Sequence, residues 1–225
     1  MVNVKNVSKA YGSKRVLQQV NLELQSGRVY GIAGENGAGK TTLFRCMAGF
    51  ESYEGIITSE FDNLKNHLGF LPTNPVFMSH ITGWEYLKLL CLARNIQSDD
   101  FESQNIFELP LKEYAENYST GMKKKLALMG ILLQQNEVFI LDEPFNGVDI
   151  HSNMIIVAII EKLKARHKTV LISSHIFSTL SDTCDEIHLL KNGVFDKRVE
   201  RQDFKELDAE MKAFFVGDRV EKLGL

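Results

Sequence analysis

The stretch GENGAGKTT, residues Gly34–Thr42, gathers glycines, a lysine and two threonines in one short segment. Residues 34–41 fit the spacing G-x-x-x-x-G-K-[ST] of a phosphate-binding loop. Glycines allow backbone N–H groups to turn inward towards phosphates, and a following helix adds the positive end of its dipole. The alternative is a glycine-rich turn that binds nothing. The flanking elements favour the phosphate loop, so we expect a nucleoside triphosphate to be bound by Gly34, Glu35, Asn36, Gly37, Ala38, Gly39, Lys40, Thr41 and Thr42.

Three side chains of this loop have distinct expected tasks. Lys40 would reach the β- and γ-phosphates, and Thr41 would bind Mg²⁺. Thr42 would offer its hydroxyl to the α-phosphate. The loop predicts a nucleotide, but by itself it does not say how the energy of that nucleotide is used.

Two carboxylates close the apolar run VFIL in the stretch VFILDEP, residues 138–144. A buried strand ending in acids would place Asp142 and Glu143 at the sheet edge beside the phosphates. Asp142 would hold Mg²⁺ through water. Glu143 would orient and deprotonate the attacking water, a general-base role that contributes about 10²–10⁴ in rate. The alternative, a helix cap or solvated loop acids, becomes the minor interpretation once a phosphate loop is present.

The elements that must position these residues alternate between strands and helices. VYGIA reads as a buried strand before the loop, and a helix is expected from Lys40 to about Met47. VFIL and TVLISS are further buried strands, with a helix over MIIVAIIEKLKARH between them. Asn192-Gly193 predicts a tight hairpin between EIHLL and VFDKR. This alternation predicts an α/β fold with a mainly parallel sheet and helices on both faces.

The middle of the chain, about residues 75–135, is expected to be a helical subdomain inserted between strands. Thr82 and Glu85 fit a capping box, and a second helix is expected to start near Ser119. One domain is predicted over residues 1–225, with its catalytic core in about residues 1–74 and 136–200. The charged tail, about residues 200–225, is expected to be helical.

Composition excludes several classes of protein. The formal net charge of −3 over 225 residues argues against a general nucleic-acid binder, so no nucleic-acid partner is expected. Cys46, Cys91 and Cys184 form neither a zinc pattern nor a disulfide framework and are expected to be buried reduced thiols. The first residues lack the apolar core of a signal peptide, and the apolar runs are too short to cross a bilayer. The chain is therefore expected to be soluble, with any membrane role exerted through a partner.

With these motifs in order, the sequence resembles the ATP-binding cassette (ABC) family of ATPases over about residues 2 to 200. YSTGMKKKLAL, residues Tyr118–Leu128, is similar to the family signature, which caps the ATP held by the opposite subunit. Ser119 and Gly121 match its most informative positions, and Thr120 and Met122 match it more loosely. The alternative is an ordinary helix N-cap followed by a solvated run of lysines, residues 123–125.

Further matches to the family are weak singly and stronger together. Tyr11 matches the aromatic residue that stacks on adenine, although a strand-end tyrosine in a turn is a serious alternative. Asn146 and Asp149, in NGVD, match the loop that crosses the dimer interface. His175 matches the switch histidine near the γ-phosphate, so the resemblance gives Glu143, His175 and Lys40 as the catalytic set.

One position departs from the family pattern. After LGFLP most members carry a Gln that touches Mg²⁺ or the attacking water, whereas this chain has Thr73 followed by Asn74. Threonine is shorter and cannot span the same gap without movement of the loop. We expect weaker metal coordination from this loop, or use of Asn74 in a shifted register.

The resemblance implies a P-loop ATPase fold with N-terminal antiparallel strands and an inserted helical subdomain. It implies a subunit that uses ATP and Mg²⁺, dimerises head to tail with a copy of itself or a related chain, and drives a separate integral membrane permease. The motif sequences are most similar to those of cassettes from simple export-type systems. The expected location is cytoplasmic, on the inner face of the cell membrane through the permease.

Other functions remain open on sequence alone. A soluble relative acting in translation or DNA maintenance is one, although this chain has one cassette and no long heptad run. A regulatory subunit that holds ATP without turnover is another, against which Glu143 and His175 argue. Apolar residues that would form the permease groove are Phe77, Met78, Ile81 and Trp84, whose alternative role is packing within the helical subdomain.

Overall fold

The computed structural model describes residues 1–215, with side chains described to residue 209, and contains two sheets. The smaller sheet is antiparallel and has the order β2 (Lys14–Leu24), β1 (Val2–Tyr11), β4 (Glu54–Ser59). The larger sheet has the order β5 (Leu68–Leu71), β6 (Val138–Asp142), β7 (Thr169–Ser174), β3 (Val29–Ala33), β8 (Glu186–Lys191), β9 (Val194–Glu200). All its pairings are parallel except β8 with β9, so the predicted α/β class is confirmed.

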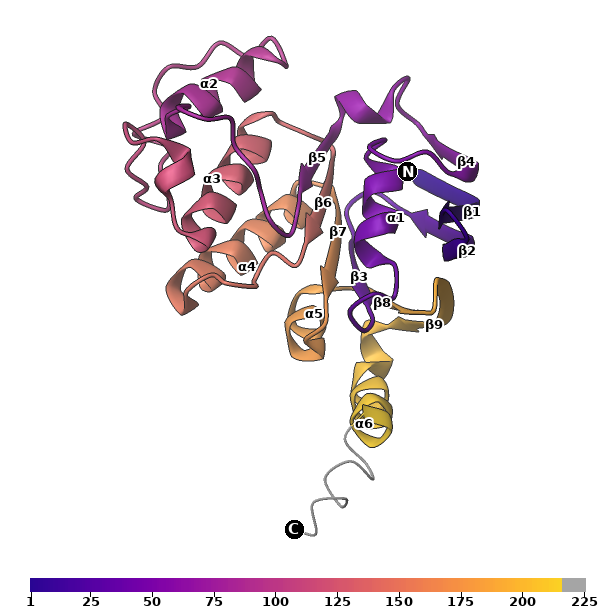
Figure 1. Cartoon of the computed structure of the whole chain (residues 1–225). Coiled ribbons are helices and arrows are strands. Elements are labelled where there is room, and N and C mark those ends of the chain that lie inside the picture. Colours follow the sequence, from indigo (N-terminus) through magenta and orange to yellow (C-terminus); the bar gives the residue numbers. More distant parts are fainter. Residues whose placement is uncertain (216–225) are drawn as a thin grey trace.

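Three central strands of the larger sheet are fully buried, as their continuous apolar runs predict: β3, β6 and β7. Figure 1 shows why both faces are covered. Helix α1 (Lys40–Met47) lies between the two sheets, whereas α2 (Gly83–Leu92), α3 (Thr120–Leu133), α4 (Ile150–Ala165) and α5 (Phe177–Thr183) lie beyond the other face. Short 3₁₀ turns cover Leu64–Asn66, Ala115–Asn117 and Arg201–Asp203.

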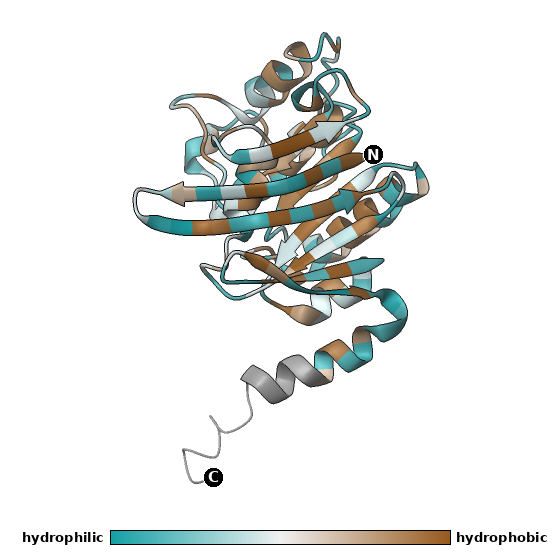
Figure 2. Ribbon diagram, turned by 90° about the vertical axis from the view of Figure 1, so that its right-hand side faces the viewer, coloured by the Kyte–Doolittle hydropathy of each residue, from teal (hydrophilic) through white to brown (hydrophobic). Residues whose placement is uncertain are grey.

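Two hydrophobic cores result, one on each face of the larger sheet. The core around α1 joins residues of the antiparallel sheet, such as Leu17, to Leu43, Phe44 and Ile140. The other core packs the remaining helices against the same sheet and contains Leu126. In Figure 2 hydrophobic and hydrophilic residues alternate along the long N-terminal strands, the pattern of a sheet buried on one face only.

The segment between β5 and β6 contains two α-helices, α2 and α3, where the sequence predicted two. Helix α2 has the predicted capping box, in which Thr82 Oγ1 accepts from the Glu85 N–H at 3.2 Å and Glu85 Oε2 accepts from the Thr82 N–H at 2.8 Å. Between α2 and α3 the chain is mostly irregular and is held by buried aromatic side chains such as Phe101 and Phe107. Side-chain packing, rather than helix formation, organises that stretch.

Helix α4 begins at Ile150, four residues before the start that apolar periodicity predicted. The reason is the cap: the Asp149 carboxylate accepts from the Ser152 N–H at 2.9 Å and from its hydroxyl at 2.8 Å. The hairpin between β8 and β9 is confirmed, with Asn192 and Gly193 both at positive φ (51° and 79°). The three cysteines are buried and free, as expected.

Helix α6 (Phe204–Phe215) follows β9 and projects away from the body of the molecule (Figure 1). It accounts for the first part of the tail that was predicted to be helical, and the rest of that prediction, residues 216–225, lies outside the described residues. Within the described part of the chain, no helix combines the length and the apolar character needed to cross a bilayer.

Candidate functional site

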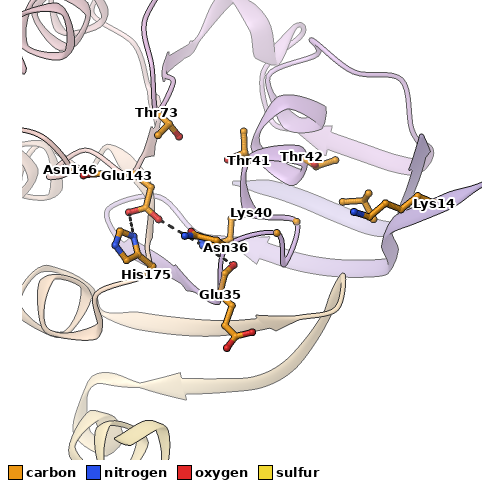
Figure 3. Close-up of a pocket in the computed structure, with 13 residues that line it drawn as sticks. Lys14, Glu35, Asn36, Lys40, Thr41, Thr42, Thr73, Glu143, Asn146 and His175 are labelled. Atoms are coloured by element: carbon orange, nitrogen blue, oxygen red, sulfur yellow. Dashed lines mark hydrogen bonds and ion pairs between the residues drawn. The ribbon is translucent and has the colours of Figure 1, made fainter. Parts of the chain in front are cut away.

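A cavity of about 510 Å³ opens where the strands β3, β6 and β7 end (Figure 3). The carboxyl ends of parallel strands are the usual place for a ligand in such sheets. Because β7 lies between β3 and β6, the strands that lead to the phosphate loop and to the two acids flank β7 on either side. The lining residues are Lys14, Val16, Glu35, Asn36, Gly37, Gly39, Lys40, Thr41, Thr42, Thr73, Glu143, Asn146 and His175.

Lys40 lies at the first position of α1 and is 6% exposed. Its Nζ donates to the carbonyl oxygens of Gly34 at 2.7 Å and Glu35 at 3.2 Å, so the side chain folds back across the loop. It also lies 3.7 Å from Glu143 Oε1. Gly37 and Gly39, both at positive φ (85° and 111°), give the loop the backbone shape that leads into α1. The loop therefore presents an ammonium group and a helix N-terminus to the cavity.

Asp142 is fully buried, and its carboxylate accepts hydrogen bonds from three hydroxyl groups in different parts of the chain. Its Oδ2 accepts from Thr41 Oγ1 and from Thr73 Oγ1, both at 2.7 Å. Its Oδ1 accepts from Ser173 Oγ at the end of β7. Thr73, one of the two residues considered for the metal site from this loop, thus reaches the same carboxylate oxygen as Thr41. Asn74, the alternative considered for this loop, is exposed and outside the cavity lining.

Glu143 is 8% exposed and points into the cavity (Figure 3). Its Oε2 lies 2.9 Å from His175 Nδ1, and its Oε1 faces Lys40. Its backbone has φ of 52°, a left-handed conformation that is costly for a residue with a side chain. The three residues expected to be catalytic, Glu143, His175 and Lys40, therefore meet in one chain of contacts.

Residues 17–146 match the protein-family model described as ABC transporter. That match covers more than half of the chain. The chain belongs to the ABC transporter family. It is the ATP-binding and ATP-hydrolysing subunit of such a transporter, and the alternative of a soluble non-transport ATPase is not supported.

Similar proteins support this assignment, and the similarity extends over nearly the whole chain. The bacitracin transport ATP-binding protein BcrA of Enterococcus faecalis is 28% identical over 97% of this chain and 75% of its own length. A solved ATP-binding subunit of an ABC transporter superposes with a TM-score of 0.83 at 25% identity, covering 93% of each chain. A dimeric ATP-binding cassette in a post-hydrolysis state, bound to ADP and Pi, has the same fold, with a TM-score of 0.80 at 22% identity over 89% of this chain and 99% of that one.

The signature segment of the cassette lies apart from its own cavity. Ser119 caps α3 by accepting from the Met122 N–H at 3.3 Å, and both Ser119 and Thr120 are exposed. Gly121 packs against the backbone of Gly147, where an added Cβ would lie 2.7 Å from the carbonyl oxygen. None of the four signature residues lines the cavity of this chain.

Besides Asn74, five other predicted residues lie outside the cavity lining, one of them the fully buried Asp142. Tyr11 is 46% exposed at the end of β1, with Lys9 Nζ 4.9 Å from its ring centroid. Gly34 and Ala38 are buried and shape the loop: a Cβ on Gly34 would meet the Leu190 carbonyl oxygen at 2.4 Å. Asp149 caps α4, and the hydrogen bonds from Ser152 hold the pKa of its carboxyl well below the usual range.

Four residues near the site were not singled out from the sequence. Lys14 and Val16 line the cavity from the start of β2, and Ser173 holds both Asp142 and the Glu143 N–H. A polar residue at the end of the buried run TVLISS was the available signal for Ser173. Lys124 is 1% exposed in α3, so the lysine run of residues 123–125 is not uniformly solvated.

The residues suggested for a permease groove pack mainly within the helical region. Trp84 meets Phe101 edge to face with 5.6 Å between the ring centroids, and Phe77 meets Tyr86 in the same way at 4.7 Å. Phe77, Ile81 and Trp84 all pack against the hydrophobic core. Met78 is different, because 60% of it is exposed.

Proposed function

We propose that this chain binds Mg²⁺·ATP in the 510 Å³ cavity and hydrolyses it with Glu143 as the general base. The observation that carries the proposal is the contact of Glu143 with both His175 and Lys40 in the cavity formed by the phosphate loop. A carboxylate so placed can accept a proton from water that attacks the terminal phosphate.

Lys40 and His175 complete the proposed catalytic set. Lys40 would exchange its carbonyl partners in the loop for the oxygens of the β- and γ-phosphates, where a positive charge stabilises developing negative charge. His175 holds the Glu143 carboxylate through Nδ1, which leaves its other ring nitrogen available to face the γ-phosphate.

The donor set at Asp142 fits magnesium. Two hydroxyl groups, from Thr41 and Thr73, converge on one carboxylate oxygen, and Mg²⁺ favours such oxygen ligands together with waters and substrate phosphates. No cluster of three or more His, Cys, Asp or Glu side chains suited to a metal occurs in the described part of the chain. A metal held by one carboxylate and the nucleotide agrees with that finding. Bound there, the ion would neutralise charge on the phosphates.

A second ATPase subunit is the proposed partner at the signature segment. Ser119, Thr120, Gly121 and Met122 lie at an exposed helix N-terminus away from their own cavity, which suits an anion held by another subunit. The dimeric cassette of the same fold supports this arrangement, with either a copy of this chain or a related one. Asn146 and Asp149 would lie at that interface.

An integral membrane permease is the second proposed partner, and it would hold the cassette on the inner face of the membrane. The relative BcrA is named for bacitracin transport, which supports work on a transported molecule through such a partner. Residues 1–74 and 136–200 form the catalytic core in this proposal, about residues 75–135 the helical subdomain, and residues from about 200 the tail.

The first test is the substitution Glu143→Gln, which keeps the shape of the side chain and removes its basicity. ATP hydrolysis should fall by about 10²–10⁴, whereas binding of a fluorescent ATP analogue should be unchanged. Hydrolysis at the wild-type rate would overturn the proposed role of Glu143.

The same variant tests the partners. Tagged Glu143→Gln protein, incubated with ATP and solubilised native membranes, should recover an integral membrane protein in fixed ratio together with a second ATPase subunit. Recovery of ribosomes or DNA instead would contradict the permease.

A further inference from the structure

Lys124 is a buried cation in α3, with 1% of its surface exposed. Its Nζ donates to the backbone carbonyl oxygens of Glu143 at 2.7 Å and Asn146 at 2.8 Å. An ammonium group taken out of water is costly unless it is well hydrogen-bonded. The two carbonyl oxygens are therefore the partners that make this buried charge tolerable, and both belong to the loop that follows β6.

The backbone of Glu143 is held in its left-handed conformation, with φ of 52°, from two sides. Its N–H donates to Ser173 Oγ at 3.0 Å, and its carbonyl oxygen accepts from Lys124. Such a conformation costs of order 1–3 kcal/mol and persists only where the surroundings enforce it. Lys124 and Ser173 are the side chains that enforce it here.

That conformation decides where the Glu143 carboxylate points. The side chain enters the cavity, with Oε2 against His175 Nδ1 and Oε1 towards Lys40 Nζ. Relaxation of the backbone to the ordinary right-handed region would redirect the Cα–Cβ bond and withdraw the carboxylate from His175. We propose that Lys124 is a positioning residue for ATP hydrolysis, which fixes the backbone of Glu143 so that its carboxylate faces the attacking water. This inference rests on the proposed role of Glu143 as general base.

Charge around Lys124 agrees with this role. Burial lowers the pKa of the Lys124 ammonium, and the nearby negative charges of Glu143 and Asp142 oppose that fall. The competing interpretation is that Lys124 only ties α3 to the loop. That tie is also made by other residues, since Lys125 pairs with Asp149 at 3.2 Å and Gly121 packs on Gly147. A tie alone affects stability, whereas positioning affects the chemical step.

The test compares Lys124→Met, which keeps a similar length without charge or donor, with Lys162→Met, a control at an exposed lysine of α4. For the Lys124 variant kcat should fall by about tenfold or more, because small displacements of a catalytic group are costly. Its Kd for a fluorescent ATP analogue should stay within about twofold of wild type, since the phosphate loop is untouched. The control should match wild type in both. An unchanged kcat, or a loss confined to Kd, would overturn the inference.

A double substitution separates positioning from general damage. In a Glu143→Gln background, Lys124→Met should change the residual single-turnover rate by less than about twofold, because a residue that acts through Glu143 has nothing left to position. A further tenfold loss would contradict the inference. If Glu143→Gln alone retained activity, the proposed function would fail first; if it were inactive while Lys124→Met kept full activity, only the inference would fail.

A second variant covers the case in which Lys124→Met does not fold. Lys124→Gln retains an uncharged N–H donor on a shorter side chain. It should give a kcat between those of wild type and Glu143→Gln, with nucleotide affinity preserved. Wild-type kcat in a folded Lys124→Gln protein would overturn the inference in the same way.

Discussion

At the scale of single residues, Asp142 is the point where the departure from the family pattern can be understood. Thr73 is too short to replace a glutamine side chain, yet its hydroxyl reaches Asp142 Oδ2 at 2.7 Å, the oxygen that Thr41 also contacts. The short side chain of Thr73 therefore donates a hydrogen bond to the Asp142 carboxylate and does not extend towards the substrate. A position that looked defective in the sequence is connected to the candidate metal site.

The substitution Thr73→Val keeps the shape of this side chain and removes the hydroxyl. A hydrogen bond contributes about 1 kcal/mol, so the Mg²⁺ concentration for half-maximal ATPase activity should rise about fivefold. Titration of activity with Mg²⁺ at saturating ATP measures this, and Thr73→Ser should stay close to wild type. Identical Mg²⁺ curves for Val and wild type would exclude Thr73 from the metal site.

The candidate site was largely predictable from the sequence because its motifs are local. The phosphate loop, Glu143 and His175 each follow a short buried strand, Asp142 ends one, and parallel strands bring their carboxyl ends together. Lys124 was not predictable as a buried residue, since a lysine in a run of lysines has the composition of a solvated helix face. Its burial depends on a loop 19 residues further along the chain, and no local pattern reports that contact.

At the scale of elements, caps decide the boundaries of the helices better than apolar periodicity does. The box at Thr82 and Glu85 marked the start of α2 correctly, because both partners are close in sequence. Helix α4 starts earlier than its apolar residues suggest, because the Asp149 cap precedes an exposed Ile150. The stretch between α2 and α3 lies within the region predicted as a helical subdomain, yet it is mostly irregular and its buried aromatic residues have no helical period.

The cap of α2 can be tested by Thr82→Ala. The substitution removes the oxygen that accepts from the Glu85 N–H, and the free energy of unfolding should fall by about 1 kcal/mol. Urea denaturation measures the change, with Thr82→Ser as the control that retains the cap. A stability equal to that of wild type would show that the cap contributes nothing to folding.

At the scale of the whole molecule, a buried ionic cluster lies where the two sheets meet. His188 and Glu186 on β8 are 5% and 0% exposed, and Arg198 on β9 approaches Glu186 at 2.8 Å. A cavity of about 410 Å³ there is lined by residues of β1 and β2 as well as by His188 and Arg198. Protonation of His188 would therefore add a second positive charge, beside that of Arg198, at the junction between the two sheets.

Burial, followed by the nearby positive charge of Arg198, lowers the pKa of His188 from 6.5 to about 4, against a smaller opposing effect of Glu200. The unfolded chain binds this proton below about pH 6.5, whereas the folded chain binds it only near pH 4. Stability from the neutral histidine is thus fully present above pH 6.5 and is lost as the pH falls towards 4. The loss attributable to His188 should be about 1 kcal/mol per pH unit in that window.

His188 Nε2 lies 2.6 Å from Glu186 Oε1. Comparing wild type with His188→Gln removes the titrating imidazole, because glutamine can donate to Glu186 but does not titrate. Burial raises the pKa of Glu186, and because this carboxylate contacts His188 directly, the difference between the two proteins reports the titration of the His188–Glu186 pair. Urea unfolding from pH 7 to pH 4.5 should show the wild type losing stability faster than the variant. Parallel curves would mean that His188 binds its proton as readily in the folded chain as in the unfolded one, and acid sensitivity would then have to arise from the carboxylates alone.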